Sequence, residues 1–266
     1  MPKRKETRKK LHELLTHWPK GMVATQPWLT KQGVSRFLVN TYERSRWVRR
    51  IARGAYARLD DTVDWTGALH AVQFQLGVPV HVGGRRALEI QGYGHFVRMR
   101  EGGTVRLYAP KGTRLPAWFL RFPWNVTFRY TAADLFPGRM EAGLTPRPVG
   151  EYPIRLSSPE RAMLELVHEV RISELFGDAR LMMEGLTTLR AELVQELLEV
   201  CGSVKAKRLF LFLAEEAGHE WAKSLNVSRV DLGKGKRSIV KGGRFDSKYQ
   251  ITVTPKGEPA TTSEVP

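Results

Sequence analysis

Four polar side chains recur at helical spacing between residues 36 and 44. They are Arg36, Asn40, Glu43 and Arg44, and positions i, i+4, i+7 and i+8 share one face of a helix. In the major groove of duplex DNA, arginine bonds guanine O6 and N7, and asparagine bonds adenine N6 and N7. These residue types at this spacing therefore predict a helix that reads double-stranded DNA.

Two short helices must hold this stripe in place. Thr25 stands where an N-cap belongs, before a short apolar helix through Trp28 and Leu29 that Gly33 ends. Ser35 caps the next helix, residues 36–47. Its expected core side holds Leu38, Thr41, Tyr42 and Ser45.

Two strands around a glycine turn follow the second helix. Residues 47–51 and 55–58 have strand composition, and arginines lie near the turn at 52–54, as phosphate contacts require. This order predicts a winged helix-turn-helix. The predicted DNA-binding residues are Thr25, Gln26, Ser35, Arg36, Asn40, Arg44, Arg49, Arg50 and Arg53. The alternative is a small helical domain with a solvated basic face.

The charge distribution favours the DNA-binding interpretation. Residues 1–58 contain 15 lysines and arginines against three acidic residues, which gives a net charge of +12 out of +16 for all 266 residues. Basicity concentrated in this segment is what a phosphate-binding module requires.

A second group of cations stands near the C-terminus among glycines. It consists of Lys234, Lys236, Arg237, Lys241 and Arg244. These residues form either a second surface for nucleic acid or a partner, or the solvated turns of hairpins. The sequence alone leaves both interpretations open.

The residues that resemble catalytic groups lack catalytic spacing. His168–Glu169 and the acidic residues around His219 do not form the HExxH pattern of a zinc site. The one cysteine, Cys201, excludes an internal disulfide and a cysteine-rich metal site. Asp231, Asp246 and Lys248 only loosely resemble a nuclease site. We therefore predict no enzymatic activity, no metal and no cofactor; the competing hypothesis is a DNA-processing enzyme delivered by a winged helix.

The remaining pattern predicts an α+β protein. Its domains are expected at 1–60 (winged helix-turn-helix) and 61–256 (mixed helices and sheet), with a disordered tail at 257–266. Expected helices are 65–76, 85–90, 160–170, 174–185, 189–201 and 204–217. Expected strands are 78–82, a hairpin of 93–100 with 104–109, 119–130, 154–156, 229–232, 238–240 and 249–254; residues 137–152 read as an exposed connection.

Several segments resemble one bacterial family. Residues 25–29 (TQPWL), 33–35 (GVS) and 45–56 (SRWVRRIARGAY) are similar to the N-terminal domain of AbiEi-type antitoxins. Residues 80–84 (VHVGG), 87–89 (ALE), 158–165 (SPERAMLE), 205–210 (KAKRLF), 231–237 (DLGKGKR), 241–243 (KGG) and Tyr249 are similar to the antitoxin domain. Together the segments span about residues 11–254, and their joint order carries the resemblance.

The resemblance implies a transcriptional repressor that is also the antitoxin of a type IV toxin–antitoxin pair. Such a protein represses its own operon and counteracts a nucleotidyltransferase-like toxin encoded beside it, without a tight complex between the two. No apolar run approaches the roughly 20 residues of a membrane span, and the charged N-terminus lacks a signal-peptide pattern. We therefore expect no membrane partner and a cytoplasmic location.

Overall fold

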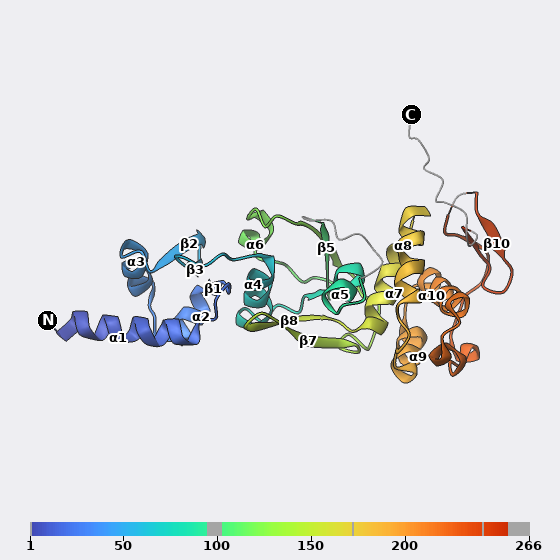
Figure 1. Ribbon diagram of the computed structural model, residues 1–266, viewed down its shortest axis with the longest axis horizontal. Coiled ribbons are helices and arrows are strands. Elements are labelled where there is room, and N and C mark those ends of the chain that lie inside the picture. The colour runs from blue at the N-terminus through green and yellow to red at the C-terminus, as the bar shows by residue number, and fades with distance from the viewer. Residues whose placement is uncertain (1, 95–102, 172, 241, 255–266) are drawn as a thin grey trace, which may run out of the picture.

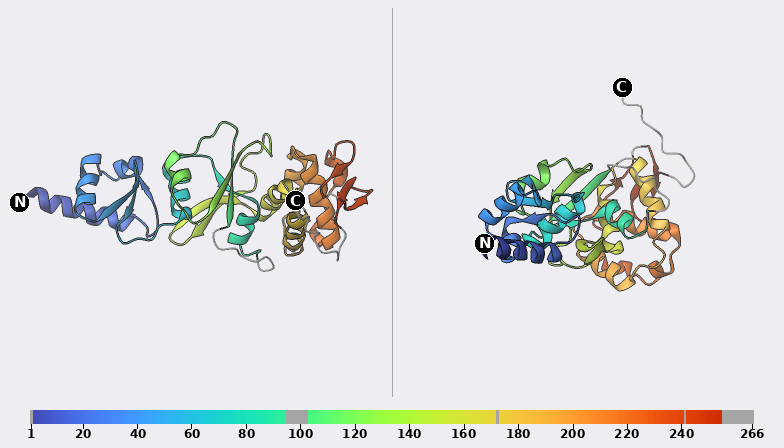
Figure 2. Two further views of the ribbon diagram at one scale, coloured as in Figure 1. Left: turned by 90° about the horizontal axis from the view of Figure 1, so that it is seen from above. Right: turned by 60° about the vertical axis from the view of Figure 1, so that its left-hand side comes forward.

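The chain forms an elongated α+β molecule, described here as a computed structural model of residues 2–94, 103–171, 173–240 and 242–254 (Figure 1). A small sheet with helices lies at the N-terminal end, and a five-stranded sheet lies in the middle. A group of helices with a second small sheet lies at the other end (Figures 1 and 2). The predicted α+β class is confirmed.

The N-terminal part packs three helices on a three-stranded antiparallel sheet of order β1-β3-β2. Its elements are α1 (Pro2–His17), β1 (Ala24–Thr25), α2 (Gln26–Lys31), α3 (Arg36–Arg44), β2 (Val48–Ala52) and β3 (Ala55–Arg58). Buried apolar side chains from all three helices form one cluster, among them Leu11, Leu14, Trp18, Leu29, Val39 and Tyr42. This burial fixes how α3 is turned.

Both predicted helix caps are present. The Thr25 hydroxyl accepts a hydrogen bond from the Trp28 backbone N–H (3.4 Å), and the Ser35 hydroxyl accepts one from Leu38 (3.3 Å). Gly33, between the two helices, has φ +74°, a left-handed conformation that glycine adopts without a steric cost. The expected core side of α3 was partly wrong, because the helix ends at Arg44 and leaves Ser45 exposed at its C-cap.

The N-terminal part is hydrogen-bonded to the middle of the molecule. The Gln75 side chain accepts from the Thr25 backbone N–H and donates to the Val23 carbonyl, both over 2.8 Å. The Val23 N–H also donates to the Gly67 carbonyl over 3.3 Å. The side chain of Gln75 thus occupies the free edge of β1, which covers backbone groups that an edge strand would leave unpaired.

The middle part contains a five-stranded mixed sheet of order β6-β5-β4-β8-β7. Neighbours β4 and β8, and β5 and β6, run parallel, whereas β4–β5 and β7–β8 are antiparallel. The strands are β4 (His81–Val82), β5 (Thr104–Ala109), β6 (Thr127–Ala132), β7 (Leu144–Val149) and β8 (Tyr152–Ser157). The accompanying helices are α4 (Trp65–His70), which continues into a π-helical turn (Ala71–Gln75), α5 (Gly84–Ile90) and α6 (Ala117–Arg121).

Two predictions for the middle part were wrong. Residues 137–152 were expected to be an exposed connection, but Leu144–Val149 is an edge strand that tolerates Pro146 and Pro148 because one of its sides has no partner strand. The first residues of the expected strand 119–130 belong to helix α6, which begins after Pro116. The first arm of the expected 93–100 hairpin lies mostly outside the described residues.

The C-terminal part confirms the predicted helices. They are α7 (Pro159–Glu169), α8 (Ser173–Glu184), α9 (Ala191–Val200) and α10 (Val204–Ala217), followed by α11 (Glu220–Lys223) and a 3₁₀ turn (Val227–Arg229). The expected strand at 229–232 is absent, since these residues leave the 3₁₀ turn and enter a loop. A small sheet of order β10-β11-β9 closes the chain, with β9 (Arg237–Ser238), β10 (Arg244–Asp246) and β11 (Ile251–Val253). The expected tail, 257–266, lies outside the described residues.

One buried carboxylate joins the sheet to the helices. The Glu165 side chain of α7 is 1 % exposed and accepts hydrogen bonds from Ser157 (2.7 Å), Arg161 (3.0 Å) and the Gly84 N–H (3.1 Å); His81 lies 3.0 Å away. Burial alone would raise the pKa of Glu165, but His81, Arg161 and Ser157 outweigh it and hold the pKa at about 2. A Cβ atom on Gly83 would collide with this carboxylate, which explains the glycine at that position.

Candidate nucleic-acid interface

The solvent-facing side of α3 is defined by what the helix buries. Val39 and Tyr42 are 1 % and 2 % exposed and point into the N-terminal core. At about 100° per residue, Phe37, Asn40 and Arg44 lie opposite them, at the centre of the exposed side. Arg36 lies on the flank of this side, and all four side chains are exposed. The structure thus places three members of the predicted polar stripe in solvent together with Phe37, whereas the fourth, Glu43, is half-buried.

Phe37 is the residue that the sequence prediction missed. Its side chain is 80 % exposed, more than any other large apolar side chain among the described residues. The prediction anchored the helix on Leu38 and Tyr42 and did not consider Phe37. A helical projection anchored on Val39 and Tyr42 would have placed Phe37 outward.

Arg50 of β2 connects the hairpin to α3. Its guanidinium donates to the Asn40 side-chain oxygen (3.2 Å) and pairs with the Glu43 carboxylate (2.8 Å). The same guanidinium lies 5.6 Å from the centre of the Tyr56 ring. Arg50 takes one of the two acceptor positions of the Asn40 oxygen, which leaves the second acceptor position and the amide NH₂ for another partner.

The other two hairpin arginines have different surroundings. Arg49 is half-buried and donates to the Asp61 carbonyl over 3.1 Å. Arg53 is exposed at the turn beside Gly54, whose φ of +80° allows the tight reversal. Within the described part of the chain, Arg53 has no acidic partner. Arg53 is therefore the hairpin cation that is free to meet a phosphate.

Two predicted contact residues lie inside the domain. Thr25 is 1 % exposed, with its hydroxyl used in the cap of α2. Gln26 is 9 % exposed and its amide NH₂ lies 3.3 Å from the Thr30 hydroxyl. Ser35 is exposed, but its hydroxyl caps α3. The side chains of these three residues make hydrogen bonds within α2 and α3. The outward surface is therefore formed by α3 and the hairpin turn.

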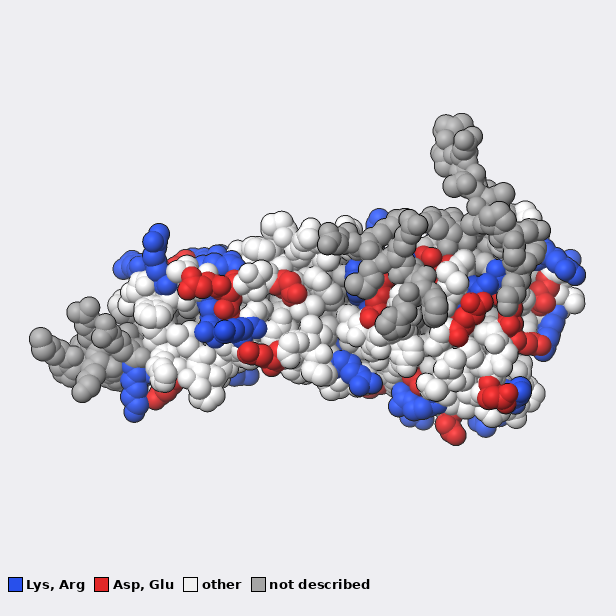
Figure 3. All heavy atoms as spheres, viewed as in Figure 1, with Lys and Arg blue, Asp and Glu red and all other residues white. Residues whose placement is uncertain are grey.

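Lysine and arginine side chains gather over α3 and β2 in the space-filling view (Figure 3). The exposed cations of α2, α3, the turn after α3 and the hairpin are Lys31, Arg36, Arg44, Arg46, Arg50 and Arg53. Glu43 is the single acidic residue between positions 14 and 59, and it pairs with Arg50. This surface suits a polyanion.

The second basic cluster lies at the opposite end of the molecule, around β9 and β10 (Figures 1 and 3). Lys234, Lys236, Arg237 and Arg244 are exposed and have no carboxylate partner among the residues described; Lys241 lies outside them. The Lys236 ammonium sits 4.9 Å from the ring centre of Phe245, which is 40 % exposed. The four described cations therefore lie on the surface without ion pairs to described carboxylates.

The candidate catalytic residues are engaged separately. His168 contacts the Ser203 hydroxyl (2.9 Å), Lys248 pairs with Glu215 (2.6 Å), and Asp231 accepts from the Gly233 N–H (2.8 Å). Burial lowers the pKa of His168, and burial raises the pKa of the Cys201 thiol. No group of three or more His, Cys, Asp or Glu within the described ranges could hold a metal ion.

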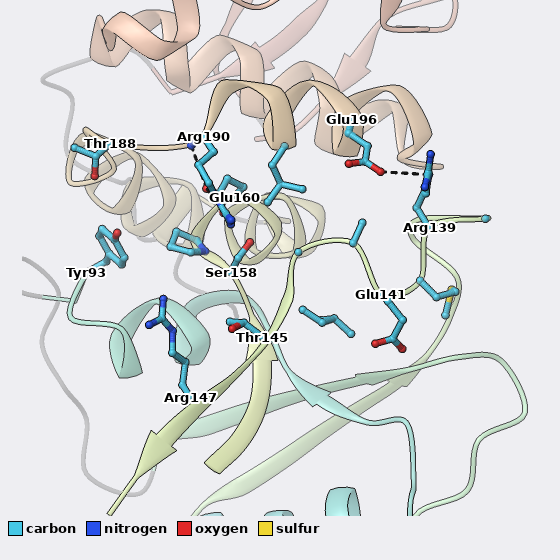
Figure 4. Close-up of a pocket in the computed structure, with 17 residues that line it drawn as sticks. Tyr93, Arg139, Glu141, Thr145, Arg147, Ser158, Glu160, Thr188, Arg190 and Glu196 are labelled. Atoms are coloured by element: carbon cyan, nitrogen blue, oxygen red, sulfur yellow. Dashed lines mark hydrogen bonds and ion pairs between the residues drawn. The ribbon is translucent and has the colours of Figure 1, made fainter.

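A cavity of about 940 Å³ lies between strand β7 and the start of α7 (Figure 4). Tyr93 and Arg147 lie along one side of it, with Thr145 and Ser158 near its centre (Figure 4). Two of its arginines are already paired, Arg190 with Glu160 (3.0 Å) and Arg139 with Glu196 (3.2 Å). The cavity therefore presents a charge-balanced lining, unlike the basic surface of α3.

Comparisons with known proteins agree with this organisation. None of the functionally curated proteins that were compared matches the chain. The crystal structure of the RV2827C protein from Mycobacterium tuberculosis superposes with a TM-score of 0.61 at 16 % identity, covering 91 % of this chain and 89 % of that one. At this identity the likeness is one of fold. No described helix has the length and apolar character to cross a membrane.

Two family models match consecutive parts of the chain. The model described as "Transcriptional regulator, AbiEi antitoxin N-terminal domain" matches residues 7–99. The model described as "Transcriptional regulator, AbiEi antitoxin, Type IV TA system" matches residues 102–254. The chain therefore belongs to the AbiEi antitoxin family, the transcriptional regulators of type IV toxin–antitoxin systems.

Proposed function

We propose that the N-terminal part is a winged helix-turn-helix that places α3 in the major groove of its own promoter. One observation carries the proposal: the exposed side of α3 presents Asn40 and Arg44, and Arg50 ties α3 to the hairpin whose turn carries Arg53, unpaired among the described residues. In a helix-turn-helix the first of the two helices crosses the DNA backbone, and the second lies in the major groove. The family match at residues 7–99 supports this assignment.

The proposed contacts divide into two kinds. Arg36, Asn40 and Arg44 read base edges, because arginine and asparagine match the hydrogen-bond pattern of guanine and adenine. Arg53 at the hairpin turn contacts phosphate and fixes the register. Half-buried Arg49 and exposed Arg50 support the interface through their contacts with Asp61 and with Asn40 and Glu43, and buried Thr25 and Gln26 are left out of the contact surface.

We further propose that the protein represses its own operon and counteracts a nucleotidyltransferase-like toxin encoded beside it, as an antitoxin in the cytoplasm. The winged helix-turn-helix at residues 1–60 serves repression, and residues 61–256 serve the counteraction without chemistry on the DNA. Family membership supports the antitoxin role. The charge split supports the division of labour, since +12 of the +16 net charge precedes residue 59.

DNase I footprinting on the region upstream of the reading frame tests the proposal. Wild-type protein should protect one or more discrete stretches at 150 mM salt and leave a shuffled fragment of equal length unprotected. Adding Mg²⁺ or Mn²⁺ without DNase I tests the competing hypothesis, because a DNA-processing enzyme would then cut the labelled fragment. A protein that protects no discrete site in this region would contradict the proposed function.

A further inference from the structure

The second residue of α3, Phe37, carries an exposed phenyl ring. It is 80 % exposed and belongs to neither of the two buried apolar clusters. It also makes no aromatic or cation–π contact among the described residues. A large apolar side chain left in water gains no hydrophobic stabilisation, so folding alone gives no reason for a phenylalanine here.

The neighbours of Phe37 indicate what covers it. The ring lies on the same side of α3 as Asn40 and Arg44, with Arg36 adjacent in the chain. An apolar protein face packed on this side would bury arginines without carboxylate partners, at a high desolvation cost. Duplex DNA can cover the ring and also pair with the arginines, because its phosphates and base edges accept hydrogen bonds from these cations.

The major groove offers one apolar group, the C5-methyl of thymine, and phenylalanine is among the side chains that contact it. Phe37 is the second residue of α3, and the N-terminal residues of a groove-bound helix are those that reach base edges. We propose that Phe37 is a specificity residue that selects thymine by covering its methyl group. This inference rests on the proposed function and adds a determinant of base preference to it.

Replacing thymine by uracil tests the inference, because it removes the C5-methyl group and keeps every hydrogen-bonding atom. The probe is the region upstream of the reading frame, amplified with either dTTP or dUTP, and full-length protein is titrated against both fragments. Wild type should bind the uracil fragment about fourfold more weakly for each methyl group covered. The variants Phe37→Ala and Phe37→Gln should bind both fragments with equal, reduced affinity.

Two controls make the result specific to Phe37. Arg36→Ala on the same helix should weaken binding yet keep the wild-type preference for thymine. Phe74→Ala removes another exposed phenyl ring, 42 % exposed and on the π-helical turn, and should leave both affinities unchanged. Because Phe37 is solvent-exposed, its variants should melt at the wild-type temperature.

The outcomes separate the two proposals. Specific binding of the thymine fragment with no loss on uracil, or an equal loss in wild type and in Phe37→Ala, overturns the inference and leaves the DNA-binding function standing. Failure of wild type to bind the thymine fragment more tightly than a shuffled fragment overturns the proposed function, and the inference falls with it.

Discussion

Arg50 of strand β2 holds the side-chain oxygen of Asn40 on α3, with 3.2 Å between donor and acceptor. The same guanidinium pairs with Glu43 at 2.8 Å, so a hairpin residue restricts how the Asn40 amide is turned. An asparagine that reads adenine must present its amide in one orientation. The hairpin therefore holds the side chain that we propose reads a base.

The first prediction concerns this positioning role. Arg50→Lys keeps the charge but loses the two-pronged geometry, so specific binding should weaken by about 1 kcal/mol or more. Binding to a shuffled fragment and the slope of log K against log salt should stay at wild-type values. Titrations at four salt concentrations measure both quantities. A shallower salt slope for Arg50→Ala, equal to one lost phosphate contact, would show that Arg50 binds the backbone instead.

The second prediction distinguishes the other two hairpin arginines. Arg53→Ala should make the slope of log K against log salt shallower by about 0.9, because one phosphate contact is lost. Arg49→Ala serves as the matched control, since Arg49 is tied to the Asp61 carbonyl and its loss should leave the slope unchanged. Equal slopes for Arg53→Ala and wild type would remove Arg53 from the interface.

The third prediction concerns stability and pH. The pKa of Glu165 is depressed to about 2 in the folded chain, against about 4.3 in an unfolded one. The ionised carboxylate therefore stabilises the fold above about pH 4.3, and this contribution is lost as pH falls toward 2. Glu165→Gln should lower the free energy of unfolding by about 3–5 kcal/mol at pH 7, with the difference from wild type narrowing at pH 3.

Urea unfolding at pH 7, 4 and 3 measures this difference. Glu169→Gln on the same helix is the control, because Glu169 forms a partly exposed pair with Arg106 and should cost about 1 kcal/mol or less. If the difference in unfolding free energy between wild type and Glu165→Gln stays constant over this pH range, the pKa of Glu165 is not depressed in the folded chain.

The sequence predicted the regular features of the fold and missed those set by tertiary context. The sequence predicted the caps at Thr25 and Ser35 and the helices of the C-terminal part. These features depend only on residues that are close together in the chain. Strand β7 was missed because Pro146 and Pro148 suggest a loop, and only its place at a sheet edge permits them. Local composition cannot show which strand lies at an edge.

The candidate site divides in the same way. The polar stripe of α3 was predicted from spacing, and the structure places Arg36, Asn40 and Arg44 in solvent. The different surroundings of Arg49, Arg50 and Arg53 could not be read from the sequence, because they depend on Asp61 and Glu43 lying near the folded hairpin. Only the folded domain therefore shows which hairpin arginine has no acidic partner among the described residues.

The fourth prediction separates repression from toxin counteraction. Full-length protein with Arg36→Ala and Asn40→Ala should lose repression of an upstream-region reporter, because both changes lie on the exposed side of α3. Co-expressed with the neighbouring toxin at wild-type levels, the same variant should still restore growth. Cells that remain poisoned although the variant is present and folded would tie toxin counteraction to DNA binding.

Whether α3 reads the operator is best measured with Asn40→Ala, because this substitution changes no charge. Affinity for the footprinted site and for a shuffled fragment should be measured in parallel, with Ser45→Ala at the exposed end of α3 as the control. If α3 reads the operator, Asn40→Ala should lose about 1–3 kcal/mol of binding free energy on the site and nothing on the shuffled fragment. Undiminished affinity for the site, or an equal loss on both fragments, would contradict it.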